Sequence, residues 1–88
     1  MKLMKNDFEK ASVHVHVSPG ESLKMIRELQ GISQNKLAEM VGIPQPNISA
    51  IESGVIHLGR ERALAFARAL RVHPSVLLFP DFDIRQVA

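Results

Sequence analysis

The chain contains no cysteine, no tryptophan and no tyrosine among its 88 residues. The absence of cysteine excludes disulfide bonds, metal sites built on thiolates and thiol nucleophiles. Without tryptophan and tyrosine, the core has to be built from aliphatic side chains and four phenylalanines. A small fold without covalent cross-links suits a reducing compartment, and dimerisation is one way in which such a fold gains stability.

The chain also lacks a long apolar run and a strong charge of either sign. Its start, MKLMKNDFEK, has no apolar core of a signal peptide, and no segment approaches the ~18 apolar residues of a membrane span. The net charge is only +2, from 11 Lys and Arg against 9 Asp and Glu. We therefore expect a cytoplasmic protein with no membrane partner, made of one small domain.

Residues 12–17, SVHVHV, alternate strictly between polar and apolar side chains. This is the pattern of a half-buried β-strand, with Val13, Val15 and Val17 on one face. A single strand cannot satisfy its own hydrogen bonds, so it would pair with the C-terminal tail, with a second copy of the chain or with another protein. We favour the last two.

Five helices are expected after this strand, at about 19–30, 33–41, 44–53, 60–70 and 74–78. Serine, glycine and proline residues mark their ends: Ser33 as an N-cap, Gly31 and Gly42 after helix ends, and Pro74 in a first turn. The predicted inward faces of the first four helices are Leu23, Ile26 and Leu29; Leu37, Ala38 and Val41; Ile48 and Ile51; and Leu64, Ala67 and Leu70.

The predicted fold is therefore all-α, with a short N-terminal β-strand. Residues 1–18 form an arm and the strand, residues 19–79 form the helical domain, and residues 80–88 form a tail.

Residues 33–54 are the most informative part of the sequence, because they predict two short crossing helices around the glycine at 42. Ala38 is small where the helices would approach each other, and Ile48 and Ile51 would plug one face of the second helix. The outer face keeps uncharged residues that can donate and accept hydrogen bonds: Gln45, Asn47 and Ser49, with Ala50 beside them. This spacing is typical of a helix-turn-helix whose second helix enters the DNA major groove. The alternative is a helical hairpin that only packs.

Several positions carry a resemblance to a known family: Ile32, Ser33, Gln34, Leu37, Ala38, Val41, Gly42, Ile43, Ile48, Ser49, Ile51, Glu52 and Gly54. At these positions the chain resembles the Xre/Cro–CI class of helix-turn-helix domain found in lambdoid phage repressors. The similarity covers about Leu23 to Leu78, the full five-helix, lambda-repressor-like domain of that class. It implies binding to double-stranded DNA.

The resemblance also implies roles for single residues. Gln34 would bond a phosphate and brace a base-reading side chain, and Gln45 would be the main base reader. The other implied DNA contacts are Pro46, Asn47, Ser49, Ala50 and Ser53. Arg27 and Glu52 match an ion pair that ties the first helix to the reading helix.

The loop after the second of these helices departs from many phage repressors, because it carries no cluster of Lys and Arg. It offers Val55, Ile56, His57 and Leu58 instead. Phosphate contacts would then depend on the arginines that follow or on two subunits; the basic excess of the chain lies here, in Arg60, Arg62, Arg68 and Arg71. The apolar loop residues Val55, Ile56 and Leu58 either contact a second copy or a partner, together with the valine strand, or fold under the fourth helix.

Other chemistry has little support in the sequence. His14 and His16 share one face of the predicted strand, but no third metal ligand lies nearby, and no catalytic set of residues is present. We predict no metal, no cofactor and no enzymatic activity. The leading hypothesis is a dimeric transcriptional regulator that represses from a palindromic operator. The alternative, suggested by the strand and its polar arm, is an antitoxin resembling the HigA kind, which binds a toxin protein and represses its own operon.

Overall fold

The computed structural model describes residues 17–80, and these contain five helices and no strand. The helices are α2 (Pro19–Leu29), α3 (Gln34–Val41), α4 (Gln45–Ser53), α5 (Arg60–Leu70) and α6 (Pro74–Leu78). The five-helix prediction is confirmed. The predicted strand falls at 12–17, so all of it except Val17 lies outside the described residues, as do most of the arm and tail.

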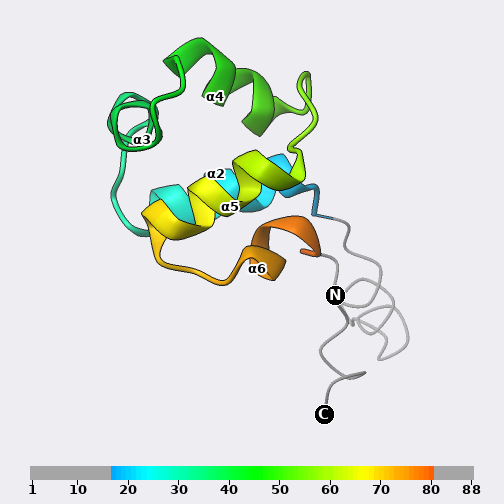
Figure 1. Cartoon of the computed structure of the whole chain (residues 1–88). Helices are drawn as coiled ribbons and strands as arrows, with labels where there is room; N and C mark the ends of the chain where they lie inside the picture. Colours follow the sequence, from blue (N-terminus) through cyan, green and yellow to red (C-terminus); the bar gives the residue numbers. More distant parts are fainter. Residues whose placement is uncertain (1–16, 81–88) are drawn as a thin grey trace, which may run out of the picture.

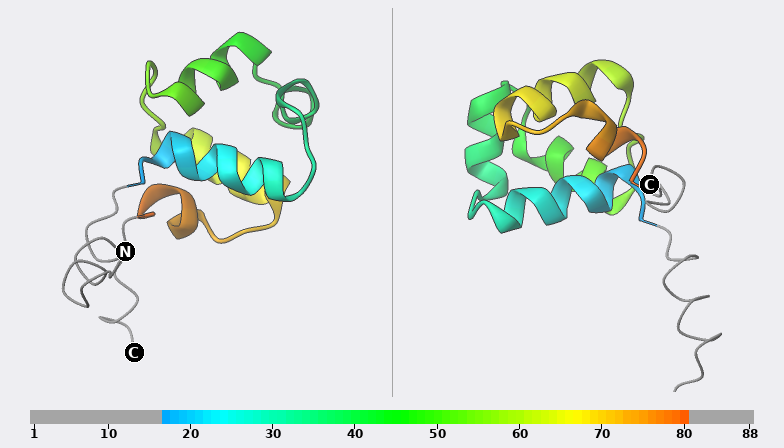
Figure 2. Two further views of the ribbon diagram at one scale, coloured as in Figure 1. Left: turned by 180° about the vertical axis from the view of Figure 1, so that it is seen from behind. Right: turned by 90° about the horizontal axis from the view of Figure 1, so that it is seen from below.

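The helices are arranged in layers around one core. Helices α2 and α5 lie next to each other in the middle, α3 and α4 cover one side of them, and α6 packs against both from the other side (Figure 1). The view from behind shows the same order (Figure 2, left). Within residues 17–80 no helix is long and apolar enough to cross a membrane.

Local sequence signals explain where the helices begin and end. The hydroxyl of Ser18 accepts from the Glu21 N–H at 3.1 Å while the Glu21 carboxylate accepts from the Ser18 N–H at 2.9 Å, which is a capping box. The hydroxyl of Ser33 caps α3 through the Lys36 N–H at 3.0 Å. Gly42 ends α3 with φ 72°, a conformation that glycine adopts at little cost.

Within residues 17–80, the core is aliphatic around one buried phenylalanine, Phe66. Its buried apolar residues are Leu23, Leu37, Ile48, Ile51, Leu58, Ala63, Phe66, Ala67, Leu70 and Leu77. The predicted inward positions of α3 and α4 are confirmed, because Leu37, Ile48 and Ile51 are buried while Ala38 and Val41 pack against the core.

Two predicted core residues lie on the surface instead. Leu29 is 83% exposed, because the inward position in the last turns of α2 is occupied by Arg27. Leu64 is 46% exposed, because α5 turns Ala63 and Phe66 inward. In both helices the sequence predicts a leucine at the inward position, whereas packing against the neighbouring helices buries a different residue.

Candidate nucleic-acid interface

Helices α3 and α4 form the predicted pair, and the turn between them is short. The carbonyl of Ala38 accepts from the N–H groups of Gly42 and Ile43, at 2.8 and 3.2 Å. Pro44 is the N-cap of α4, so Gln45 is its first residue, and Pro46 follows where a missing N–H costs nothing. The side chain of Gln45 therefore projects from the start of α4, next to the start of α3.

A buried ion pair ties α2 to the end of α4. The Nε and Nη2 atoms of Arg27 donate to the two carboxylate oxygens of Glu52, at 2.7 and 3.0 Å, and Nη1 donates to the carbonyl of Ile32 at 2.7 Å. Both side chains are buried, at 7% and 5% residue exposure. The hydrogen bond to Glu52 is the main reason that the pKa of Arg27 is raised above its usual value. The ion pair that the resemblance implied is present.

Hydrogen bonds extend from this ion pair to the start of α4. Gln34 donates from Nε2 to Glu52 Oε1 at 3.0 Å, and Gln45 donates from Nε2 to Gln34 Oε1 at 2.8 Å. We call this connected set of Arg27, Glu52, Gln34 and Gln45 the glutamine relay. It joins residues of α2, α3 and α4, and it holds Gln45 against Gln34, as the resemblance implied.

The sequence does not predict one hydrogen bond of the relay, that between Gln34 and Glu52. The contact between Gln34 and Glu52 joins residues 18 positions apart, and their spacing along the chain gives no sign of it. The clue was chemical, since a carboxylate oxygen has lone pairs left after one bond to arginine, and a buried one needs further donors. Gln34 supplies that donor at the edge of the buried pair.

The remaining predicted contact residues lie along α4 at different depths. Pro46 and Ser53 are exposed, whereas Asn47, Ser49 and Ala50 are partly buried. The hydroxyl of Ser53 donates to the Ala50 carbonyl at 3.1 Å, so at the end of α4 it stays close to its own backbone. Their contacts with DNA stay predictions.

The apolar residues of the loop after α4 differ in how deeply they are buried. Val55 is 81% exposed, and Ile56 is partly buried against the core, with its N–H on the Ala50 carbonyl at 3.0 Å. Leu58 is only 3% exposed, which corrects its prediction as a partner contact. Leu58 belongs to the hydrophobic core instead, as the second alternative expects. His57, between them, is exposed.

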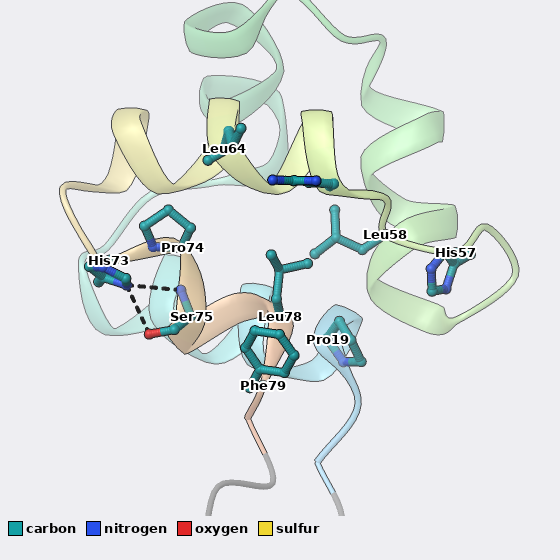
Figure 3. Close-up of a pocket in the computed structure, with 10 residues that line it drawn as sticks. Pro19, His57, Leu58, Leu64, His73, Pro74, Ser75, Leu78 and Phe79 are labelled. Atoms are coloured by element: carbon teal, nitrogen blue, oxygen red, sulfur yellow. Dashed lines mark hydrogen bonds between the residues drawn. The ribbon is translucent and has the colours of Figure 1, made fainter.

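An open apolar groove of about 660 Å³ lies where α5, α6 and the start of α2 meet (Figure 3). Leu64 and Phe79 line it with side chains that are 46% and 63% exposed, and Leu58 contributes from the core side. The His73 Nδ1 atom caps α6 by accepting from the Ser75 N–H at 3.1 Å, which fixes one wall. None of the residues of the glutamine relay lines this groove.

Comparison with known proteins gives a consistent result. The model of the helix-turn-helix family matches residues 23–77. A helix-turn-helix-type transcriptional regulator of Sinorhizobium fredii, y4wC, is 34% identical over 64 residues, which are 73% of this chain and 43% of that protein. The matched region of this chain thus spans less than half of that relative's length.

Two solved structures have the same fold. The P22 c2 repressor in complex with a synthetic operator superposes with a TM-score of 0.67 at 31% identity, over 73% of this chain and 97% of that one. The restriction-modification controller protein C.AhdI from Aeromonas hydrophila gives 0.66 at 28% identity, over 77% and 98%.

Proposed function

Because the chain belongs to the helix-turn-helix family of DNA-binding transcriptional regulators, we propose that it represses transcription by binding one operator sequence in the cytoplasm. The observation that carries this proposal is the glutamine relay. It presents a neutral amide at the start of α4 and anchors that amide, through Gln34, to a buried ion pair. A side chain held in this way loses little freedom on binding, which favours selective recognition.

The free atoms of Gln45 suit adenine. One of its N–H groups is used on Gln34, which leaves the second N–H and the Oε1 atom. Adenine offers a donor at N6 and an acceptor at N7 in the major groove, so a glutamine amide can bond both at once. Gln45 would therefore read an A·T base pair, while other groups bind phosphates.

Selection from random double-stranded DNA, followed by binding measurements over a salt series, tests this function. We expect the chain to enrich one sequence, and the logarithm of its binding constant to fall with the logarithm of salt concentration. Gln45→Ala should weaken discrimination at one base pair by ~1–3 kcal/mol and leave the fold intact. Binding that ignores sequence even at low salt would contradict the proposal.

We further propose that the repressor is a homodimer on a palindromic operator. Helix α4 has nine residues, and the apolar loop that follows it adds few charges for phosphates. Two copies would double the contacts with bases and the contacts with phosphates. Their reading helices would lie about 34 Å apart in successive major grooves.

The apolar groove is our candidate for the face between the two copies. Exposed Leu64 and Phe79 give it an apolar surface that a second copy would cover. The chain enters the domain at Pro19 and leaves it after Phe79, and both residues line the groove. The strand predicted at 12–17 ends two residues before Pro19, so pairing between two such strands would bring two grooves together.

A second candidate function is neutralisation of a toxin protein. It rests on the alternating residues 12–17, all of which except Val17 lie outside the described residues. Co-expression with the product of the neighbouring reading frame tests it. A stable complex that relieves growth inhibition would support an antitoxin, and a neighbour that inhibits nothing would contradict it.

A further inference from the structure

We propose that Glu52 determines which base Gln45 prefers, although it touches no DNA itself. It would act as a positioning residue that fixes the orientation of two side-chain amides in succession. This inference rests on the proposed function, because it concerns the base that the same site selects.

The first step is the fixed polarity of the Glu52 carboxylate. Its two oxygens accept three hydrogen bonds, two from Arg27 and one from Gln34. An ionised carboxylate can only accept, and a guanidinium can only donate. The pair therefore has a single arrangement, and it requires an N–H group from any amide that contacts Glu52 Oε1.

The second step carries this polarity outward. Gln34 has to turn its NH2 group toward Glu52, so its oxygen faces Gln45. Gln45 then has to donate to that oxygen, and its own oxygen is left at the far side of the amide. Each amide could rotate by 180° at little cost in an isolated side chain. In the relay, the opposite orientation would set oxygen against oxygen or N–H against N–H.

The third step concerns the base. Adenine and guanine share the N7 acceptor but differ at the 6-position, where adenine donates from N6 and guanine accepts at O6. An outer amide oxygen accepts from adenine N6 and repels guanine O6. The orientation set by Glu52 thus converts a side chain that could bind either purine into one that prefers adenine.

The double variant Arg27→Met/Glu52→Leu tests the inference because it removes the group that fixes the polarity of the relay. It leaves Gln34 and Gln45 in place, but neither amide then has a fixed partner that only accepts or only donates. The two amides can pair in either orientation. We expect the preference for adenine at the base pair read by Gln45, about tenfold in the unchanged protein, to fall to near unity.

The measurement is the ratio of dissociation constants for two duplexes that differ only at this base pair, which Gln45→Ala identifies by abolishing the preference there. A purely structural role of Glu52 would weaken binding to both duplexes equally. A ratio that falls to near unity supports the inference, and an unchanged ratio overturns it.

Gln34→Met is the second test, and it decides the question even where the double variant fails to fold. It interrupts the relay without removing the ion pair, so Gln45 rotates freely and the preference for adenine falls to near unity. Lys36→Met, on the exposed part of α3, is the matched control and keeps the preference. A Gln34→Met protein that still prefers adenine tenfold would overturn the inference. An unchanged protein that selects no sequence would contradict the proposed function, and this inference with it.

Discussion

Arg27 and Glu52 show how one pair of charges serves both the fold and the site. Burying two ions costs desolvation free energy that offsets much of their attraction, so the intact pair adds little net stability. Its value lies in geometry, since it joins α2 to α4 and fixes the polarity of the relay. The raised pKa of Arg27 keeps its guanidinium charged. A contribution from this shift would be lost only as pH rises through that raised pKa, far above neutrality.

Removing one partner of this pair should lower the free energy of unfolding by far more than the intact pair raises it. Arg27→Met leaves the buried Glu52 carboxylate with Gln34 as its remaining donor, and we expect the free energy of unfolding to fall by about 3 kcal/mol. Urea denaturation of the purified protein measures this. The double variant with Glu52→Leu should recover part of the loss, because no buried charge remains. A single variant as stable as the unchanged protein would mean that the pair is solvated.

Two helix backbones, those of α2 and α4, approach each other closely at Gly20 in the first turn of α2. A Cβ atom there would clash with the Ile51 carbonyl oxygen and lie 3.0 Å from that of Glu52, both in α4. Glycine is thus required by the packing of two backbones. The sequence predicts such a contact only at the small residue Ala38.

Gly20→Ala should therefore destabilise the fold, although alanine is the better helix former by about 1 kcal/mol. The shift of α2 away from α4 that the clash demands should cost ~1–3 kcal/mol. Thermal unfolding followed by circular dichroism measures the change. Lys24→Ala, at an exposed position of the same helix, is the control and should have little effect. An increase in melting temperature for Gly20→Ala would contradict this packing.

At the end of α5 we expect a substitution that stabilises the fold. Arg71 is the C-cap of α5 with φ 58°, in the left-handed region that favours glycine. Arg71→Gly should raise the free energy of unfolding by roughly 0.5–1 kcal/mol, since this conformation strains a side chain with a Cβ. Arg68→Gly, one turn earlier inside the helix, should lower it by about 1 kcal/mol. Chemical denaturation of both variants compares them, and equal effects would exclude a role for the backbone conformation.

Helices α3 and α4 were predictable from sequence because their caps, turn glycine and apolar plugs are local signals. The buried faces of α2 and α5 were less predictable. Leu29 and Leu64 look like core residues by type, but tertiary contacts decide which side of a helix is buried, and periodicity leaves an uncertainty of one position. Two pairs of the relay, Arg27 with Glu52 and Gln34 with Gln45, are implied by the family resemblance and not by spacing or composition. Its continuity depends on how three helices meet.

For the whole molecule, the reading site and the apolar groove use separate sets of residues. The relay joins α2, α3 and α4, whereas the groove lies between α5, α6 and the start of α2. A change at the groove can therefore alter assembly while it leaves base recognition intact. This separation allows the two proposals, base selection and dimer formation, to be tested independently.

Leu64→Glu places a charge in the groove at a half-exposed position, so the monomer should fold while the homodimer dissociates. Sedimentation equilibrium measures the change in the proposed dimer. We expect its dissociation constant to rise at least tenfold, because burying a carboxylate costs more than ~1.4 kcal/mol, of which the exposed Arg60 at the groove offsets only part. Affinity for a palindromic operator should fall, whereas affinity for a single half-site should not. Leu29→Glu, at a more exposed leucine outside the groove, is the matched control. If both variants dissociate equally, or if neither does, the groove is not the face between the copies.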